Sequence, residues 1–408
     1  MATEYNSTAT PTQVETMVEK HPSLNDIRQK IKNNITQSQF RIFILYPDET
    51  IKTEIPQEDI QTGGDYSEHY QDGQRRSLSF TLYNEDGKYT PNINVFWANA
   101  RLRLDVGIKI SESTTYWFQK GIFIVSSAVP SISPTGKTVQ ISASDKFSLF
   151  EGATGTLQGS YEVPINMDIE NLIRDILHTN SGDGYLLDSR DFIYHSSFKG
   201  KKTQVAISKS TGDNLGSILL EIATQLSAEV YYNEYGNLVF EPTSETTLDQ
   251  NKPVLYYYYT NLGEIENLSF SLDYTSIVNR VVVIGTTSTG GTFTAEAVNN
   301  DPSSPLCYQR IGYRTGDTIN DSNIYSYYLA EERAEYELRK QLILESSTSS
   351  EVVFNPILKV NGVIAIFDEF TQLNNERFLI QSLSFSLDYS NKMNITFSNL
   401  NNLPFVVK

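Results

Sequence analysis

Cysteine is almost absent from this chain of 408 residues, in which Cys307 is the only thiol. One thiol cannot form an intrachain disulfide, and it rules out zinc sites that use two or more cysteines. The four histidines, His21, His69, His178 and His195, do not have the spacing of a metal-binding motif. We therefore expect a fold that needs no disulfide, metal or cofactor.

Long apolar runs are also missing. No stretch approaches the roughly 20 apolar residues of a membrane-spanning helix. The opening MATEYNSTAT is polar and has no signal-peptide core. These two absences predict a soluble protein that is made in a cytoplasm.

Basic residues are outnumbered by acidic ones. Lys and Arg number 32 against 49 Asp and Glu, which leaves a formal net charge of −17. Such a surface repels the phosphates of nucleic acids, so specific DNA binding through a basic patch is not expected. It still allows DNA to pass without sticking.

Motifs of catalytic chemistry are missing as well. No serine stands in a G-x-S-x-G elbow, and no histidine lies within fifty residues of Cys307. Residues 285–292 read GTTSTGGT, but Gly291 stands where a phosphate-binding lysine belongs, which favours a hairpin loop. Paired carboxylates from distant strands are not excluded by any pattern. The sequence therefore indicates no catalytic residue.

What the chain does contain is a repeat, because residues 123–144 and 378–398 follow one plan. The first begins FIVSS and, after eight residues, ends GKTVQISAS; the second begins FLIQS and, after eight residues, ends NKMNITFS. Gly136 and Asn391 tolerate the left-handed backbone of a tight turn. Each stretch predicts a β-hairpin, and the repetition indicates a scaffold of two similar β domains.

The first β domain is predicted over residues 38–159, where the apolar period is two. Strands are expected at residues 41–46, 78–83, 102–110, 116–126 and 139–144, which indicates an antiparallel β-barrel or sandwich. Residues 1–37 are rich in Asn, Ser, Thr and Gln with a weak helical pattern. They predict a helical arm that orders against a partner or a neighbouring subunit, with a disordered tail as the alternative.

A small α+β domain is predicted over residues 160–262. An apolar stripe at positions 0, 3, 4 and 7 of residues 169–176 predicts a helix, with Asn166 or Asp168 as its cap. A second helix is expected over residues 215–226, followed by a closing hairpin. The chain is therefore predicted to be α+β and predominantly β, with this domain inserted between two β domains.

The second β domain is predicted over residues 263–408. LSFSLDY occurs at residues 268–274 and again at residues 383–389, and its alternate apolar residues indicate a strand with one buried side. The run RVVVIG and residues 357–367 predict further strands of this domain.

One long helix is predicted near residues 325–344, within the second β domain. Two alanines on its apolar face would let the backbone approach a sheet or a partner closely. The helix either closes its own domain or lies at a subunit interface. The candidate interface residues are Tyr325, Tyr327, Tyr328, Ala330 and Ala334.

Tyrosine is abundant, with 25 copies that include Tyr256 to Tyr259 in succession. A tyrosine combines a large contact area with a polar tip, which suits protein interfaces and sugar stacking. A strand with both faces covered would use the same residues. Interface, core and carbohydrate-binding readings of these tyrosines all stay open.

The order of β domain, insertion and β domain resembles the baseplate hub and tail-tip hub proteins of tailed bacteriophages. It is also similar to the tube-mimicking half of type VI secretion spike proteins. The residues that carry the resemblance are YGNLVFEP at 235–242, NRVVVIG at 279–285, and the closing segment 356–398 with Gly362 and Asp368.

The resemblance implies a homotrimeric structural hub located in the tail baseplate or tail tip of a virion. In such hubs the two tail-tube-like barrels of three subunits form a ring that adapts a sixfold tube to a threefold spike. Implied partners are the tail tube or distal tail protein, the central spike or tail-tip protein, and wedge proteins that meet the arm. Three copies would carry three times −17, about −51, around a lumen through which DNA passes without specific binding.

Other functions stay open beside the hub. A carbohydrate-binding or receptor-binding tail module would bind host cell walls, and a cell-wall glycosidase would hydrolyse them. A tube or distal tail protein would assemble as hexamers. The chain ends at Lys408, directly after the second β domain, which favours a structural protein over an enzyme.

Overall fold

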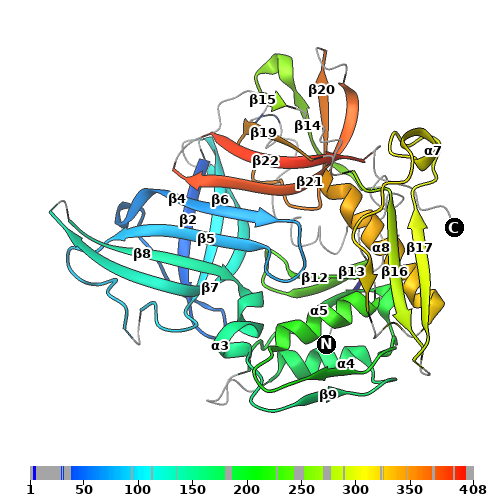
Figure 1. The fold of residues 1–408 in the computed structure, drawn as a ribbon. Coiled ribbons are helices and arrows are strands. Elements are labelled where there is room, and N and C mark those ends of the chain that lie inside the picture. The colour runs from blue at the N-terminus through cyan, green and yellow to red at the C-terminus, as the bar shows by residue number, and fades with distance from the viewer. Residues whose placement is uncertain are drawn as a thin grey trace.

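The protein is mostly antiparallel β-sheet with few helices, as the sequence predicts (Figure 1). The computed structural model describes residues 3–5, 29, 31, 38–92, 95–111, 114–134, 136–179, 186–226, 228–242, 252–269, 277–287, 290–321, 324, 326–345, 347–369, 373–388 and 391–400. Among these residues, thirteen strands join into one sheet, which lies above a smaller α+β layer.

The first half of the large sheet runs in the order β3-β2-β6-β7-β8-β5-β4. Its strands are β2 (Ser38–Leu45), β3 (Ile51–Glu54), β4 (Ile60–His69), β5 (Arg76–Tyr83), β6 (Arg101–Ser111), β7 (Thr114–Ser133) and β8 (Gly136–Asp145). The five strands expected in this half are confirmed. The sequence did not predict β3 and β4, because β3 is exposed on both faces and Gly63 and Gly64 interrupt β4.

The second half uses the same order, β14-β20-β21-β22-β19-β15. Its strands are β14 (Val254–Tyr259), β15 (Ile265–Ser269), β19 (Ser347–Val353), β20 (Val363–Asp368), β21 (Leu373–Leu387) and β22 (Lys392–Asn399). Each strand has a counterpart at the same place along the chain and in the sheet: β2, β4, β5, β6, β7 and β8 correspond to β14, β15, β19, β20, β21 and β22. One pair differs, since β14 lies parallel to β20 whereas β2 lies antiparallel to β6.

The two predicted hairpins are confirmed, and they match down to their irregularities. In the β7·β8 pair the register shifts between Val125 and Ser127; in the β21·β22 pair it shifts between Ile380 and Ser382. These are the same positions of FIVSS and FLIQS, so each hairpin has a β-bulge at its fourth repeat residue. The repeat in the amino-acid sequence therefore corresponds to a repeat in backbone geometry.

The two separate barrels expected from the sequence are not confirmed. Residues 382–387 of β21 pair antiparallel with residues 64–69 of β4, so the ladder continues from one half into the other (Figure 1). Within the described residues no ladder closes on itself. One apolar core serves both halves, and in it the ring of Tyr66 stacks on Phe385 at 4.8 Å between centroids.

The layer beneath the large sheet has its own apolar core. Its elements are β9 (Tyr161–Val163), α4 (Ile169–Leu177), β10 (Ile193–His195), β11 (Ile207–Lys209), α5 (Leu215–Leu226), β12 (Ala228–Tyr232) and β13 (Leu238–Pro242). The carboxylate of Asp168 accepts a hydrogen bond from Asn171 N at 2.9 Å, so Asp168 is the cap of α4. Both predicted helices and the closing hairpin β12–β13 are confirmed.

A third group of elements forms a separate small sheet covered by the long helix. It contains β16 (Arg280–Thr286), β17 (Thr292–Val298), β18 (Ile319–Asn320) and α8 (Tyr327–Glu345). The expectation that RVVVIG belongs to the second β domain's sheet is wrong, because β16 pairs only with β17 and β18 among the described strands. β16 and β17 pair antiparallel up to Thr286 and Thr292, which confirms that GTTSTGGT belongs to a hairpin.

Short elements link these layers. They are β1 (Thr3–Tyr5), η1 (Gln57–Asp59), η2 (Lys146–Phe150), α3 (Gly152–Gly155), η3 (Ser196–Phe198), η4 (Thr260–Leu262) and α7 (Tyr308–Ile311). Most of the predicted arm, residues 1–37, lies outside the described residues. Of the part that is described, β1 adds a parallel strand to β10, and Ile31 is buried in the large core.

The turn at Gly236 fixes the lower layer against the large sheet. Gly236 has φ +82°, and a Cβ there would lie 2.7 Å from Cδ1 of Ile122 in β7. Gly200 has φ +66° and open space around it, so it offers a matched control. An alanine would have a strained backbone at either position, but only at position 236 would its Cβ also clash with a neighbouring side chain.

We expect Gly200→Ala to lower the free energy of unfolding by about 1 kcal/mol, through left-handed strain alone. Gly236→Ala should lower it by roughly 1–3 kcal/mol more, because Ile122 must move. Urea unfolding followed by circular dichroism measures both. Equal losses in the two variants would contradict the docking of this turn on β7.

Candidate functional site: a buried junction and exposed assembly surfaces

The described residues contain no group of three or more His, Cys, Asp and Glu side chains that could hold a metal ion. The absence of metal and cofactor stays an expectation for the chain as a whole. No helix in the described part combines the length and the apolar character that crossing a membrane requires.

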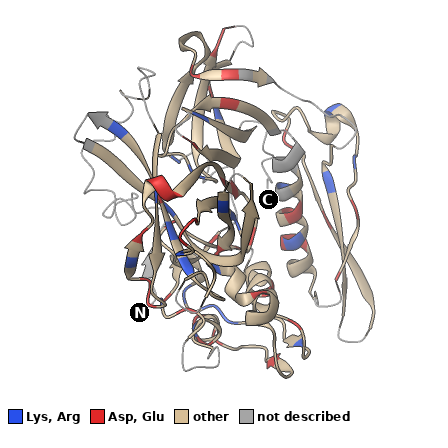
Figure 2. Cartoon of the chain, turned by 90° about the vertical axis from the view of Figure 1, so that its left-hand side faces the viewer, with Lys and Arg blue, Asp and Glu red and all other residues tan. Residues whose placement is uncertain are grey.

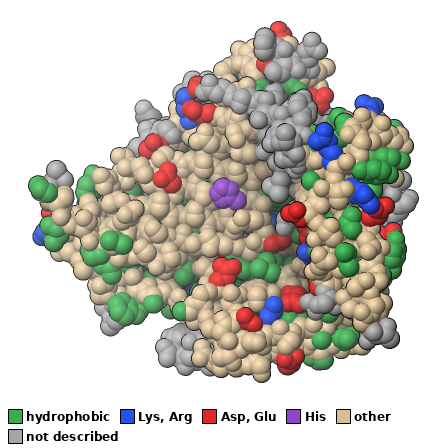
Figure 3. Space-filling model, viewed as in Figure 1, with side chains coloured by type: hydrophobic (Ala, Val, Ile, Leu, Met, Phe, Trp, Pro, Cys, Tyr) green, Lys and Arg blue, Asp and Glu red, His purple; other side chains and the backbone are tan. Residues whose placement is uncertain are grey.

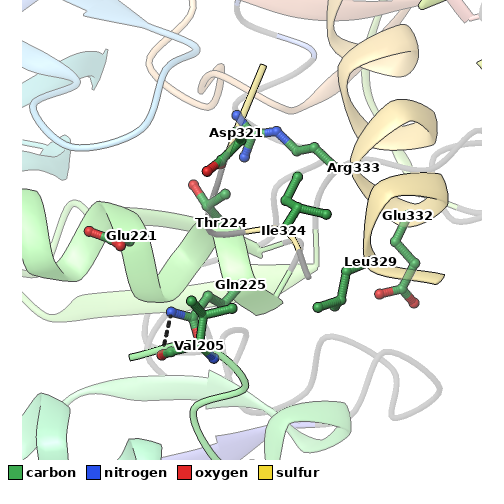
Figure 4. Close-up of a pocket in the computed structure, with 9 residues that line it drawn as sticks. All are labelled: Val205, Glu221, Thr224, Gln225, Asp321, Ile324, Leu329, Glu332 and Arg333. Carbon is green, nitrogen blue, oxygen red and sulfur yellow. Dashed lines mark hydrogen bonds between the residues drawn. The ribbon is translucent and has the colours of Figure 1, made fainter. Parts of the chain in front are cut away.

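A groove between α5 and α8 offers about 70 Å³ of space (Figure 4). This volume holds about two water molecules, whereas pockets for small ligands span roughly 300–1,000 Å³. Asp321 and Arg333 point toward one another across it, and Gln225 donates a hydrogen bond to Val205 O at 3.2 Å. The groove therefore gives no argument for carbohydrate binding.

Charged side chains gather instead at a buried junction between the large sheet and the layer beneath it. Arg75 precedes β5 and pairs with Glu229 of β12 at 2.9 Å, and its guanidinium lies 3.6 Å from the ring centroid of Tyr231. Arg76 pairs with Glu68 of β4 at 2.5 Å. All four charged groups are almost completely buried, so each charge depends on its partner.

Lys146 is the centre of the second part of the junction. Its ammonium is fully buried and lies 2.6 Å from a Glu49 carboxylate oxygen and 2.8 Å from an Asp188 oxygen. It also donates to Gly236 O at 3.0 Å, in the turn between β12 and β13. Lys146 therefore connects the β2–β3 loop, the end of β8 and the lower layer.

Asp145 ends β8 and organises the backbone around it. One carboxylate oxygen accepts hydrogen bonds from Arg75 N at 2.7 Å and Arg76 N at 2.9 Å, and the other accepts from Phe147 N at 3.1 Å. Burial raises the pKa of Asp145 to about 6 although these donors favour the charged form. Its role is structural, since all three donors are backbone groups of its own chain.

Lys120 connects the two halves of the large sheet. It lies in β7, and its ammonium donates to Pro356 O at 2.8 Å and Leu358 O at 2.9 Å, in the segment before β20. Burial lowers the pKa of Lys120 to about 8.

The junction has the polar groups of an active site but not its geometry. Its charges are paired with one another, and the groove between α5 and α8 lies elsewhere in the fold. A catalytic carboxylate needs a substrate within hydrogen-bond reach. The arrangement therefore fixes the sheet and the lower layer in one orientation.

The predicted interface residues divide into two groups. Tyr327 and Tyr328 are 57% and 60% exposed at the start of α8, so they are available to a partner. Ala330 and Ala334 are fully buried in the small core beneath α8, where the helix packs on its own sheet β16–β17. Tyr325 lies outside the described residues. The interface role stays a prediction for the two exposed tyrosines.

The run Tyr256–Tyr259 forms β14 and uses its tyrosines in two ways. Tyr256 and Tyr258 are buried in the large core, and Tyr256 donates to Glu264 at 2.8 Å. Tyr257 is 44% exposed. The core reading is therefore confirmed for Tyr256 and Tyr258, and the interface and carbohydrate readings stay predictions for Tyr257.

Sequence reasoning missed the exposed apolar end of β7. Val129 is 53% exposed and Ile132 is 81% exposed, although both stand in a regular strand. Hydrophobic side chains are visible over the β7–β8 hairpin at the left of Figure 3. Pro130 was the available signal, because a proline inside a strand indicates a sheet edge.

Charge is dispersed over the described residues. In Figure 2, segments of both charge signs lie along α8. Dispersed charge with a net of −17 does not offer the basic stripe that grips a nucleic-acid backbone.

Solved structures of two tail proteins have a similar fold. The 43 kDa tail protein of prophage MuSo2 from Shewanella oneidensis matches with a TM-score of 0.60 and 16% identity, over 90% of this chain and 99% of that one. A tail protein from Neisseria meningitidis MC58 matches with 0.60 and 10%, over 89% and 99%.

A chain of the Francisella PdpA-VgrG complex matches with a TM-score of 0.52 and 11% identity, over 97% of this chain and 57% of that one. No protein-family model and no curated protein sequence matches the chain. The structural matches confirm the resemblance to the hub family at the level of the fold.

We expect Lys146→Met to lower the free energy of unfolding by about 3–5 kcal/mol, because Asp188 would stay buried without its cation, whereas Glu49 would keep Arg190 at 2.5 Å. Lys392 is the matched control, since it also meets two carboxylates, at 2.6 and 2.8 Å, but on the surface. Lys392→Met should leave the urea midpoint almost unchanged. Similar losses in both variants would show that burial of Lys146 contributes nothing.

Lys120 predicts a pH dependence. Its folded pKa of about 8 lies below the ordinary value of 10.5, so the folded state binds fewer protons between these values. The contribution of Lys120 to the free energy of unfolding should therefore increase as the pH rises from about 8 to 10.5. The unfolding free energy of the wild type minus that of Lys120→Met should therefore increase from pH about 7.5 to about 9.5. A difference that stays constant or decreases over this range would contradict the lowered pKa of Lys120.

Proposed function

We propose that the protein is a structural component of a phage tail or a related particle, and that it forms the trimeric hub of the baseplate or tail tip. The observation that carries the proposal is one ladder order used twice within a chain whose fold matches tail proteins over 99% of their length. A chain with two equivalent halves can present six equivalent units when three copies assemble.

In this proposal the chain has an arm at residues 1–37, β units at 38–159 and 263–408, and an inserted α+β unit at 160–262. The matched hairpins β7–β8 and β21–β22 support equivalent roles for the two β units. One face of the resulting ring would dock the tail tube or distal tail protein. The opposite face would hold the central spike or tail-tip protein.

The charge of the chain suits a channel. Each copy contributes a net charge of −17, and an acidic lumen would let DNA pass without binding. The exposed Tyr327 and Tyr328 are proposed contacts to another tail protein, because tyrosine is enriched at interfaces. The arm would meet wedge proteins, and the site of action would be the tail of a virion.

The proposal assigns no catalytic role to this chain. The buried carboxylates at the junction pair with arginine and lysine, which leaves them no role as acid and base. Glycan binding and wall hydrolysis serve as outcomes of the test, because no observation in the structure favours them.

Multi-angle light scattering of the purified chain, alone and with its spike partner, tests the proposal. We expect a mass of three times 46.1 kDa. Antibody labelling in electron micrographs of the particle should mark the baseplate or tail tip.

Each contrary result identifies a different protein class. A stable monomer in the presence of the spike would overturn the hub, and six copies would identify a tube or distal tail protein. Saturable binding to purified cell walls would identify a receptor-binding module, and lysis of those walls would identify a glycosidase.

A further inference from the structure

The small sheet β16–β17–β18 and the helix α8 have an apolar core of their own. Among the described residues, every buried member of this core lies between positions 281 and 338 of the chain. We call residues 277–345 the α8 unit; it forms the right-hand edge of Figure 1. A unit with its own core can keep its fold while its orientation toward the rest of the chain changes.

The α8 unit stands where the first half of the large sheet has only a short turn. It lies in the chain between β15 and β19, whose counterparts β4 and β5 are joined by residues 70–75. That turn is fixed to β12 of the lower layer, because Gly73 N donates to Val230 O at 2.8 Å and Val230 N donates to the Asp72 carboxylate at 3.1 Å. The short turn is therefore docked, and the second half has a whole unit at the equivalent place.

The groove between α5 and α8 is part of the boundary between the α8 unit and the lower layer (Figure 4). The polar side chains that line it bond within their own side. On the lower layer, Glu221 pairs with Lys209 at 2.8 Å, and Gln225 donates to a backbone carbonyl of the same layer. On the α8 unit, Arg333 pairs with Glu337 at 2.8 Å. Opening the groove would leave these three contacts intact.

A hydrogen bond from Tyr336 crosses from the α8 unit to the rest of the chain. The Tyr336 hydroxyl donates to a carboxylate oxygen of Asp72 at 3.3 Å, and the other Asp72 oxygen accepts from Val230 N. The Tyr336 side chain is buried, and burial raises its pKa, so the phenol stays protonated and able to donate. Asp72 thus connects α8, the β4–β5 turn and the lower layer.

The two boundaries of the lower layer differ in the kind of contact that holds them. Toward the large sheet, buried ion pairs such as Arg75 with Glu229 at 2.9 Å would lose a partner if the layers separated. Toward the α8 unit, a neutral phenol meets a carboxylate beside a polar groove. A neutral hydrogen bond costs far less to break than a buried ion pair, so motion is favoured at the second boundary.

We propose that the α8 unit moves as a rigid body against the lower layer, which opens and closes the groove between α5 and α8. The hydrogen bond between Tyr336 and Asp72 holds the closed position. Tyr327 and Tyr328 at the start of α8 move with the unit, so their position relative to the lower layer changes with it. The motion belongs to a single chain and does not depend on the proposed hub.

Distances between two spin labels across the groove test this motion by pulsed electron paramagnetic resonance. Thr224 of α5 and Glu331 of α8 are exposed, so Thr224→Cys/Glu331→Cys accepts both labels, and the chain without added cysteines is the control for the buried Cys307. We expect one dominant distance and a minor, longer one. Tyr336→Phe keeps the ring and loses the hydrogen bond, so it should raise the ratio of the longer to the shorter distance about fivefold.

Two controls separate the motion from a general loosening of the fold. Tyr328→Phe removes a hydroxyl from the same helix, but Tyr328 donates to Glu332 within the α8 unit, so the distances should not change. Labels on Glu331→Cys/Thr294→Cys both lie within the α8 unit, since Thr294 is an exposed residue of β17. This pair should give a single narrow distance with and without Tyr336→Phe.

Each other outcome overturns a stated part of the proposal. A single narrow distance across the groove in both wild type and Tyr336→Phe would overturn the motion. Two distances in equal ratio in both proteins would overturn the role of Tyr336, and a broad distance within the α8 unit would overturn the rigid body. The wild-type distances test the motion by themselves, even if Tyr336→Phe fails to fold.

Discussion

The pairing of β4 with β21 is the contact on which the rest of the fold depends. It joins segments more than three hundred positions apart, as the hydrogen bond from Ser386 to Gly64 O at 3.2 Å illustrates. A shift of one residue would turn Leu383, Phe385 and Leu387 away from the core. Their burial therefore fixes the register, and the register sets how one half of the sheet continues into the other.

Buried charges then set where the lower layer sits. Desolvation makes such ion pairs weak contributors to stability when they are compared with a well-packed apolar core. Apolar surfaces can slide against each other at little cost, whereas Arg75 with Glu229 and Lys146 with Asp188 each satisfy one geometry. We infer that these pairs select one orientation of the lower layer. The proposed hub, whose two faces would meet different partners, would need that orientation to be unique.

Local pattern was enough to predict most strands and helices, and the repeat was visible in the letters themselves. The strand 78–83 alternates in burial as its sequence does, and Asp168 caps α4 as expected. Local pattern could not say which sheet a strand joins, so β16 was assigned to the wrong one. The period of two is the same whichever neighbour a strand finds. The sequence did not indicate that Lys120 and Lys146 are buried, because a lysine usually faces solvent. Their burial follows from acceptors supplied by residues far along the chain, and no local pattern contains that information.

The two halves of the large sheet differ in how far their strand edges are covered within the described residues. β21 pairs with β4 along residues 382–387, whereas β7 pairs with β6 and β8 only. An exposed strand edge favours irregular aggregation, and Pro130 within β7 removes one backbone donor. Copies with a net charge of −17 repel one another at a distance, but physiological salt screens charge beyond about 8 Å. Contacts between copies would therefore be decided at short range, where Val129 and Ile132 expose apolar side chains.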